Sequence, residues 1–491
     1  MYFSIGGCGE SLKDKYLIEL SKEFSKYRPI FNAIRKNIIA VHIGGGSPSS
    51  LTYEQLNFLF KMIQSRIDFK YIKQFSIEVN PCMVRDSDYL KKLRLFKNRG
   101  ITRISFGVQT FNERLYEINN MSQTKDDIYN FIRDIKENGF KSYSFDLLLN
   151  IVGQNINDYY SSLLETINIL PSHFALFNTH PTRSCKVTQI SDADSERCFS
   201  VLNYIFSYKL GYIELANNYA FDWSHFCFIE GGKYSLDYDV IGLGVSSHSI
   251  FKEKDIVLVY PRSFKKYYSA EEEKQFIFEK KTQFSNKNLD RVAHKRIIVN
   301  NTINIKKHNN VVYGNEAKYL HVITEGIREE LNNNFDAAER LYSESAKFRN
   351  HYLSEFCLLS LKIKNRKKID YRQINISMYP DLAKAKILYL LSRCYYQKKE
   401  IQASLHILKE IMRYNPNDLN ALSLLVLIYD DIDRKKARQY FDRIKDLTNA
   451  SFKNLTEFVI YCNALIHDES DIFLKRLFIP NSSLRIIKKP L

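Results

Sequence analysis

Three consecutive glycines, Gly44, Gly45 and Gly46, stand directly after an apolar run at residues 38–43. Because glycine has no side chain, such a segment lets the backbone approach a ligand closely and leaves its N–H and C=O groups accessible. A triple glycine alone is also typical of an ordinary tight turn, so the interpretation as a ligand site depends on what else the chain supplies.

Further polar residues follow other apolar runs at regular intervals. Glu78 and Gln109 each stand near the end of such a run, and Asp146 lies within a later one. A carboxylate such as that of Asp146 can accept hydrogen bonds from two sugar hydroxyls, as it does in dinucleotide-binding folds. By contrast, His42 and His248 are more typical of hydrogen-bonded polar residues than of acid–base groups.

The elements that must position these residues alternate between strands and helices. Such alternation predicts repeated βαβ units and a parallel sheet, either open or closed into a barrel. In both forms ligands bind at the carboxyl ends of the strands, which is where the glycines and the polar residues fall. We expect helices at residues 11–36, 52–65, 86–99 and 124–138, and strands at 37–43, 74–79, 103–108 and 142–148.

Five sequence blocks in this order resemble the coproporphyrinogen oxidase and haem chaperone branch of the radical S-adenosylmethionine proteins, over about residues 10–251. They are residues 42–51, 77–81, 100–112, 139–147 and 239–249. The resemblance implies an incomplete (β/α) barrel that binds S-adenosylmethionine. Gly44, Gly45 and Gly46 would then contact the methionine part of the cofactor. Glu78 and Gln109 would line the nucleotide site, and Asp146 would bind the ribose hydroxyls.

The chain also departs from this family. The resemblance implies a [4Fe-4S] cluster held by a Cys-x3-Cys-x2-Cys motif, but the sequence has no such motif, and Phe3 stands where its third cysteine is expected. Met121 replaces an expected arginine, and residues 149–152 replace a Tyr-Gly-Leu-Pro turn. Either the family's N-terminus is missing from this chain, or the chain evolved away from the cluster and kept the fold. We favour the second explanation.

From about residue 317 the pattern becomes helical and repeats at 34 residues. Leu391 and Tyr395 are followed by Leu425 and Tyr429, and an earlier unit contains Gly326 at a matching position. This spacing predicts an all-α, tetratricopeptide-like array, with a plain helical bundle as the alternative. We therefore expect an α/β barrel at residues 1–251, a connector at 252–316, helical repeats at 317–467 and a basic tail at 468–491.

The composition excludes some classes of protein. The net charge of +17 is spread along the chain without a dense basic arm, which indicates a basic surface rather than a nucleic-acid partner. No apolar run is long enough to span a membrane, and eight scattered cysteines favour a cytoplasmic protein. The spacings of His173, His180, Cys185 and Cys198 fit no common zinc motif, so no metal site is expected.

Three functions remain open at this point. The first is a non-radical binding or accessory protein whose helical array binds a protein or peptide. The second is an active radical enzyme, an oxidoreductase or methyltransferase, whose true start precedes Met1. The third is a haem-binding chaperone, with haem or a related tetrapyrrole as its ligand.

Overall fold

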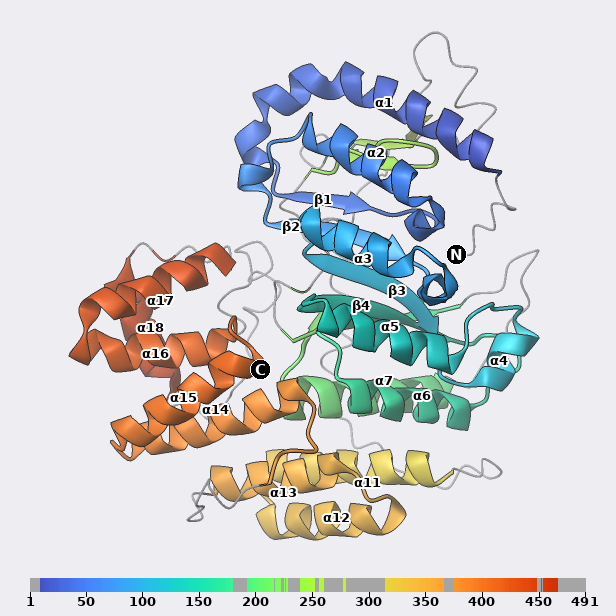
Figure 1. Ribbon diagram of the computed structural model, residues 1–491. Helices are drawn as coiled ribbons and strands as arrows, with labels where there is room; N and C mark the ends of the chain where they lie inside the picture. Colours follow the sequence, from blue (N-terminus) through green and yellow to red (C-terminus); the bar gives the residue numbers. More distant parts are fainter. Residues whose placement is uncertain are drawn as a thin grey trace.

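The computed structural model places two layers of α/β structure beside a set of packed helices (Figure 1). The structure describes residues 9–179, 192–215, 217–221, 225, 227, 239–251, 256–259, 277–279, 314–365, 375–447, 452 and 454–466. Among these residues, no helix is both long enough and apolar enough to cross a membrane.

The centre of the α/β part is a seven-stranded sheet in the order β1-β2-β3-β4-β5-β7-β6. Neighbouring strands from β1 to β5 pair in parallel, whereas β7 pairs antiparallel with both β5 and β6. The sheet confirms the predicted parallel α/β architecture. Its strands are β1 (Ala40–Ile43), β2 (Gln74–Val79), β3 (Arg103–Gln109), β4 (Ser142–Leu149), β5 (His173–Asn178), β6 (Ile213–Leu215) and β7 (Asn218–Ala220).

Helices connect the parallel strands, as the alternating pattern predicts. Three of them, α2, α5 and α6, begin with a capping box, in which Thr52, Thr124 and Asn155 accept a hydrogen bond from the first turn. The helices are α1 (Glu10–Ala33), α2 (Tyr53–Gln64), α3 (Tyr89–Asn98), α4 (Glu113–Ile118), α5 (Lys125–Glu137), α6 (Ile156–Ile169) and α7 (Asp192–Leu202). Shorter helical turns are η1 (Arg35–Asn37), η2 (Pro48–Ser50), η3 (Phe69–Tyr71), η4 (Pro81–Arg85) and the π-helical η5 (Asn203–Lys209).

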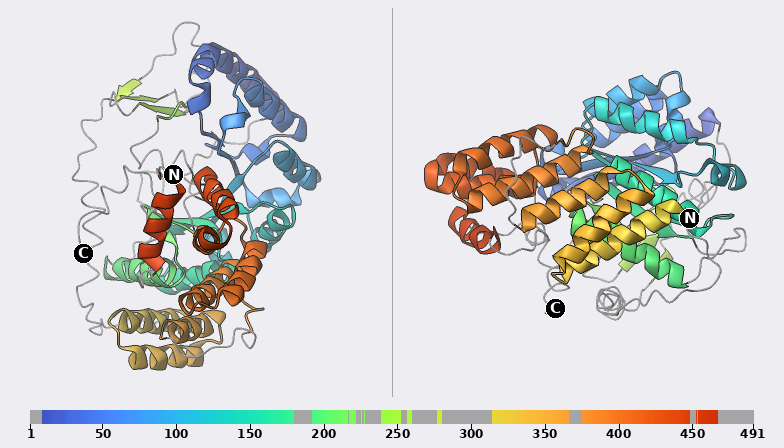
Figure 2. Two further views of the ribbon diagram at one scale, coloured as in Figure 1. Left: turned by 90° about the vertical axis from the view of Figure 1, so that its left-hand side faces the viewer. Right: turned by 90° about the horizontal axis from the view of Figure 1, so that it is seen from below.

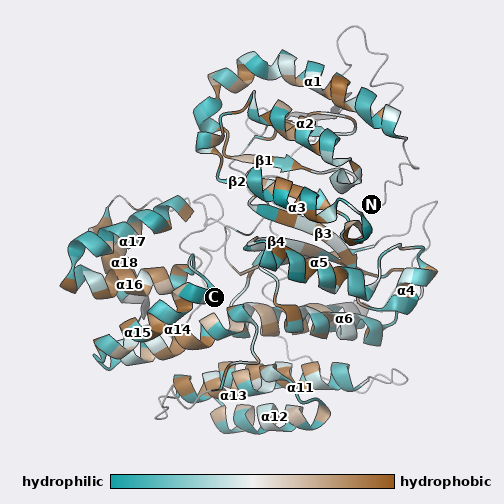
Figure 3. Ribbon diagram, viewed as in Figure 1, coloured by the Kyte–Doolittle hydropathy of each residue, from teal (hydrophilic) through white to brown (hydrophobic). Residues whose placement is uncertain are grey.

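The two faces of the sheet differ in chemistry because successive side chains of a strand point to opposite sides. One face carries buried aromatic and aliphatic residues that pack under α2, α3, α5 and α6, among them Phe75, Phe106 and Phe145. Figure 3 shows hydrophilic and hydrophobic residues alternating along α3 and α5, as helices with one buried side require. The other face carries small and polar residues, among them Ser76, Glu78, Ser105, Ser144 and Asp146.

A second, smaller core lies under α1. Leu17, Leu20 and Phe24 pack there against α2 and against Ile241 and Leu243 of the 239–249 block. The backbone N–H of Gly244 donates a hydrogen bond of 3.1 Å to the Glu23 carboxylate of α1. A three-stranded antiparallel sheet continues from this block, with β8 (His248–Phe251), β9 (Ile256–Val259) and β10 (Ile277–Glu279).

The region after residue 314 is entirely helical among its described residues, which confirms the predicted all-α part. Consecutive helices pack in pairs: α11 with α12, α14 with α15, and α16 with α17. Gly326 allows the closest approach in the first pair, because a Cβ there would lie 2.6 Å from the Tyr342 ring. The helices are α11 (Asn315–Leu331), α12 (Phe335–Phe348), α13 (Tyr352–Lys364), α14 (Asp381–Gln397), α15 (Ile401–Tyr414), α16 (Leu419–Ile432), α17 (Arg434–Leu447) and α18 (Leu455–Ile466).

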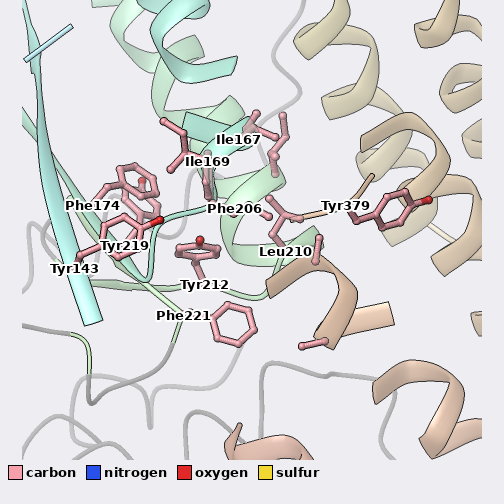
Figure 4. Packing of buried hydrophobic residues seen from close by; sticks show 14 of the residues in the cluster. Tyr143, Ile167, Ile169, Phe174, Phe206, Leu210, Tyr212, Tyr219, Phe221 and Tyr379 are labelled. Carbon is pink, nitrogen blue, oxygen red and sulfur yellow. The ribbon is translucent and has the colours of Figure 1, made fainter. Parts of the chain in front are cut away.

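The first helices of this array pack directly on the α/β part. Helix α11 contacts α6, α7 and η5, so one contiguous apolar core runs through both regions. Figure 4 shows Phe206, Leu210 and Tyr212 between the sheet and Tyr379, which precedes α14. Figures 1 and 2 together show α11–α13 stacked below α6, with α14–α18 continuing to one side.

Polar contacts also stabilise the junction between the helical array and the α/β part. The Lys209 ammonium lies 2.6 Å from the Glu330 carboxylate, which also accepts a hydrogen bond of 2.7 Å from the Tyr342 hydroxyl. His321 bonds the Tyr160 hydroxyl at 2.8 Å, and Tyr352 donates to the Ile167 carbonyl at 2.8 Å. Lys209, His321 and Tyr352 therefore each bond a group of the opposite region.

Candidate functional site

The residues singled out by the sequence lie at one edge of the sheet. Gly44, Gly45 and Gly46 follow the last residue of β1, Glu78 is the penultimate residue of β2, and Gln109 ends β3. Asp146 lies in β4 opposite Gly107 of β3. Since β1 to β4 run parallel, their carboxyl ends meet at this edge, and the six residues are brought to the same end of the sheet.

The glycine segment is tied to β2 through Glu78. The Gly45 N–H donates to Glu78 Oε2 at 2.8 Å, and Glu78 Oε1 lies 3.2 Å from His42 Nε2. A Cβ at Gly44 would lie 2.4 Å from His42 Nε2 and 2.6 Å from Glu78 Cδ, so a larger residue at position 44 would displace these two side chains. A Cβ at Gly45 or Gly46 would meet nothing within 4 Å, and both residues are exposed. The end of β1 is thus closely packed at Gly44 and open to solvent at Gly45 and Gly46.

Neighbouring groups stabilise the negative charge of the Glu78 carboxylate. Burial raises the pKa of this carboxyl, but hydrogen bonds from His42 and Gly45 and the positive charges of His42 and Arg103 outweigh burial and lower the pKa below its ordinary value. His42 is oriented in turn by Ser76, whose Oγ lies 2.8 Å from His42 Nδ1. The site therefore presents a carboxylate to a ligand at neutral pH.

Gln109 and Asp146 lie beside each other across β3 and β4. Gln109 adopts a left-handed backbone conformation with φ of 68°, at a register shift that interrupts the β3–β4 pairing. Its side chain folds back over Gly107, where a Cβ would lie 2.1 Å from Gln109 Nε2. Asp146 is the register partner of Gly107, so the amide and the carboxylate share one face of the sheet. The missing side chain at residue 107 makes this arrangement possible.

The segments that depart from the family pattern border the same edge. Met121, which stands where an arginine is expected, packs against the apolar core, and Asn120 before it has φ of 50°. In the altered turn, the Gln154 side chain accepts from Asn150 N at 2.7 Å and donates to the Leu148 carbonyl at 3.2 Å. The surviving Gln154 therefore closes the turn, and its side chain is buried.

A second polar cluster occupies the amino ends of the same strands. Arg103 begins β3, and its side chain reaches across β4 to His173, with 3.3 Å between Nη2 and Nδ1. Ser144 Oγ lies 2.5 Å from the same His173 nitrogen, and Arg103 Nε donates to the His225 carbonyl at 2.9 Å. This cluster was not predicted from the sequence, although the alternation Arg103-x-Ser105-x-Gly107 places polar or small residues on one face of β3.

His173 is neutral in this cluster. Burial is the main reason why its pKa lies well below the ordinary value, and the charges of Arg103 and His225 lower the pKa further. Since His173 Nδ1 lies within hydrogen-bond distance of two donors, Ser144 and Arg103, this nitrogen acts as the acceptor and the other ring nitrogen carries the proton.

No group of three or more metal-ligating side chains occurs in the part of the chain that the structure describes. Within that part, His173 belongs to the arginine cluster, and Cys198 is fully buried with a raised pKa caused mainly by burial. Phe3, Cys8, His180 and Cys185 lie outside the described residues. The carboxyl-end edge thus brings together open glycine backbone, two carboxylates and an amide, all of which are hydrogen-bonding groups.

Comparison with known proteins identifies the class of this region. Residues 27–164 match the family model of the radical SAM superfamily, which confirms the predicted relationship for this part of the chain. The chain therefore carries a radical SAM region whose curated homologues are coproporphyrinogen oxidases and haem chaperones.

Individual relatives share only part of their length with this chain. The oxygen-independent coproporphyrinogen III oxidase of Synechocystis is 33% identical over 165 residues, which cover 34% of this chain and 34% of that protein. Heme chaperone HemW of Bacillus subtilis is 30% identical over 170 residues, covering 34% of this chain and 42% of that protein. The solved Escherichia coli coproporphyrinogen III oxidase is 20% identical, with a TM-score of 0.46 over 60% of this chain and 69% of that one.

Proposed function

We propose that this protein binds S-adenosylmethionine at the carboxyl-end edge of its sheet and acts as a binding or accessory protein rather than as a radical enzyme. The observation that supports the binding proposal is the contact among Gly45, Glu78 and His42. Gly45 N–H and His42 Nε2 bond the Glu78 carboxylate, next to the exposed backbone of the glycine segment. Backbone groups of Gly44, Gly45 and Gly46 would hold the methionine part, and Asp146 the ribose. Gln109 and Glu78 would line the remaining part of the pocket.

Three departures from the family pattern support the non-radical part of the proposal. Phe3 stands where the resemblance places a cluster cysteine, and a phenylalanine side chain has no donor atom that could ligate iron. Met121 replaces an arginine that would contact the cofactor carboxylate, and its side chain packs against the core. Residues 149–152 replace the Tyr-Gly-Leu-Pro turn. When bound, a [4Fe-4S] cluster would supply the electron that cleaves S-adenosylmethionine, but no residue described here is assigned to hold it.

Calorimetric titration of the full chain with S-adenosylmethionine tests the binding proposal. We expect saturable binding that Asp146→Asn or Glu78→Gln weakens at least about tenfold, since hydrogen bonds to charged groups contribute roughly 1.5–3 kcal/mol. Glu54→Gln, at an exposed position in the first turn of α2, is the matched control and should bind as the parent does. Equal affinity in all four proteins would reject the assigned pocket.

Anaerobic reconstitution with iron and sulfide tests the non-radical proposal separately. We expect no stoichiometric absorbance near 400 nm from the chain, even where S-adenosylmethionine binds. A stoichiometric cluster signal would overturn the accessory role and leave the binding site intact.

Tetrapyrrole binding is the second candidate function, because two curated relatives are named as a heme chaperone and as a coproporphyrinogen III oxidase. Titration of the full chain with haem, followed through the Soret band, tests this candidate. A saturable Soret shift at one haem per chain would support it. A Soret shift no larger than that given by an unrelated helical protein in the same buffer would exclude it.

A protein or peptide partner for the helical array is proposed for its later pairs. The inward side of α11 already packs against α6 and η5, so the surface left for a partner belongs to α14–α17. Because deletion of residues 317–467 would also uncover the core beneath α11, single exposed substitutions such as Ile432→Ser are the better test in a partner pull-down.

A further inference from the structure

Arg103 is a buried cation at the amino end of the polar face of the sheet. Its side chain is among the least exposed charged groups, with 2% of its surface accessible. Six residue steps of about 3.3 Å separate it along β3 from Gln109, so the two ends of the strand lie roughly 20 Å apart. At its other end the cluster adjoins the proposed pocket, because Arg103 pairs with Ser76 of β2 and its charge acts on Glu78 two residues further.

The hydrogen bonds of Arg103 do not neutralise its charge. A guanidinium carries five N–H donors, and the two bonds of this one go to the His225 carbonyl and to His173 Nδ1, both uncharged acceptors. Among the described residues, no carboxylate lies within ion-pair distance of Arg103. Glu78 responds to the charge of Arg103, but the Glu78 carboxylate is bonded to Gly45 and His42 instead.

Burial of an unpaired charge is costly, and a protein normally compensates it with a counter-ion. The described residues around Arg103 hold the guanidinium in one orientation, and none of them supplies that ion. Ser142 and Ser144 of β4 are small, so the arginine can lie across them, and Ser142 Oγ and Ser144 Oγ hold His225 and His173 at 3.0 and 2.5 Å. The second imidazole, His173, is kept neutral and does not compete for an anion.

We propose that Arg103 binds an oxyanion, a carboxylate or a phosphate group, at the amino end of the polar face. A guanidinium binds such groups through two parallel N–H···O bonds, and Arg103 has the remaining donors to make them. His173 and Ser144 are positioning residues that fix the plane of the guanidinium. The proposal uses Arg103, His173 and Ser144, none of which is assigned to the S-adenosylmethionine pocket.

Thermal unfolding of the full chain in acetate, in inorganic phosphate and in chloride at equal ionic strength tests this site. Ligand that binds only the folded state raises Tm with saturation. We expect such a rise over chloride in acetate, in phosphate or in both, and the responding salt identifies the class of oxyanion. Identical Tm curves in all three salts would overturn the proposal without affecting the S-adenosylmethionine titration.

Two substitutions at Arg103 and one elsewhere complete the test. Arg103→Gln removes the charge, and Arg103→Lys keeps the charge but loses the planar fork, so both should raise the apparent Kd for the oxyanion at least about tenfold. Arg99→Gln is the matched control, because Arg99 bonds Gln64 and Asn57 on the outer surface. A purely structural arginine would change Tm equally in all three salts, and that result would reject the oxyanion site.

Discussion

Buried polar groups occur in two regions of this molecule, and the two regions treat them differently. At the junction with the helical array, Lys209, Glu330 and Tyr342 satisfy one another across 2.6 and 2.7 Å. On the inner face of the sheet, the Arg103 charge has only neutral acceptors among the described residues. The first region is complete without a ligand, whereas the second is completed only by an added anion.

The comparison gives a way to separate structural from functional polar residues in one chain. Removing a member of the paired cluster should lower stability and leave ligand binding unchanged. Changes on the polar face of the sheet should alter ligand binding with smaller effects on stability. Four experiments test this distinction.

The largest expected effect is on the paired ion cluster. Glu330→Gln should lower the free energy of unfolding by about 3–5 kcal/mol, because it leaves the Lys209 ammonium buried without its partner. Urea unfolding measures this loss. Glu329→Gln is the control, since the Glu329 carboxylate bonds an exposed Asn334. The double change Lys209→Met with Glu330→Met should recover most of the loss, and failure to recover would mean that the ion pair has a role beyond charge neutralisation.

The second effect concerns acid. Burial, above all other causes, lowers the pKa of His321 and of His351 at the junction to about 4. In the unfolded chain the pKa of a histidine is about 6.5. Between pH 6.5 and 4 the unfolded chain therefore binds more protons than the folded chain. Each histidine should therefore cost up to about 3 kcal/mol of stability as pH falls through that window.

Unfolding by urea at a series of pH values measures this slope. His321→Gln keeps a donor for Tyr160 and cannot be protonated, so its stability should fall less steeply than that of the parent between pH 6.5 and 4. Parallel curves for the two proteins would contradict the assignment.

The third effect tests the packing beneath the open strand end. Gly44→Ala should lower stability by about 1–3 kcal/mol, because the new Cβ would overlap His42 and Glu78. Gly46→Ala adds a Cβ into open space and should change stability by less than about 0.5 kcal/mol. If both variants melted at the parental temperature, the close contact among Gly44, His42 and Glu78 would be wrong.

The smallest effect is the titration of Glu78. Its folded pKa lies below the ordinary 4.5, so its charged form stabilises the folded state above that pH and the contribution disappears as pH falls through the folded pKa. Because the side chain is partly exposed, we expect less than about 1 kcal/mol. Differential scanning calorimetry of the parent and Glu78→Gln below pH 4.5 measures the difference. A steeper acid loss in the variant than in the parent would reverse the sign and refute the assignment.

The sequence predicted the strands and their polar ends well, because local chemistry determines both. The apolar runs at 74–79 and 142–148 correspond to β2 and β4, and the glycines fall after β1 as expected. Helix α3 begins at Tyr89 rather than at residue 86, because η4 and a turn occupy the preceding residues. The 34-residue spacing predicted paired helices but not α13, which stands between two pairs.

Contacts between distant residues could not be predicted in this way. Arg103 bonds the carbonyl of His225, 122 positions further along the chain, and Lys209 pairs with Glu330, 121 positions further. Neither pair leaves a periodic signal, because each depends on how the layers pack. The packing of α11 on α6 and η5 is a further contact of this kind.

The hydrogen bond between Gly244 and Glu23 also bears on how the chain acquires its shape during synthesis. Glu23 leaves the ribosome 221 residues before Gly244, which at 5–20 residues per second is a delay of roughly 10–45 s. Throughout that interval the apolar side of α1 that later packs on Ile241 and Leu243 has no cover from them. The nascent protein therefore leaves this part of α1 uncovered until its middle third has emerged, and only the side that packs on α2 can be buried earlier.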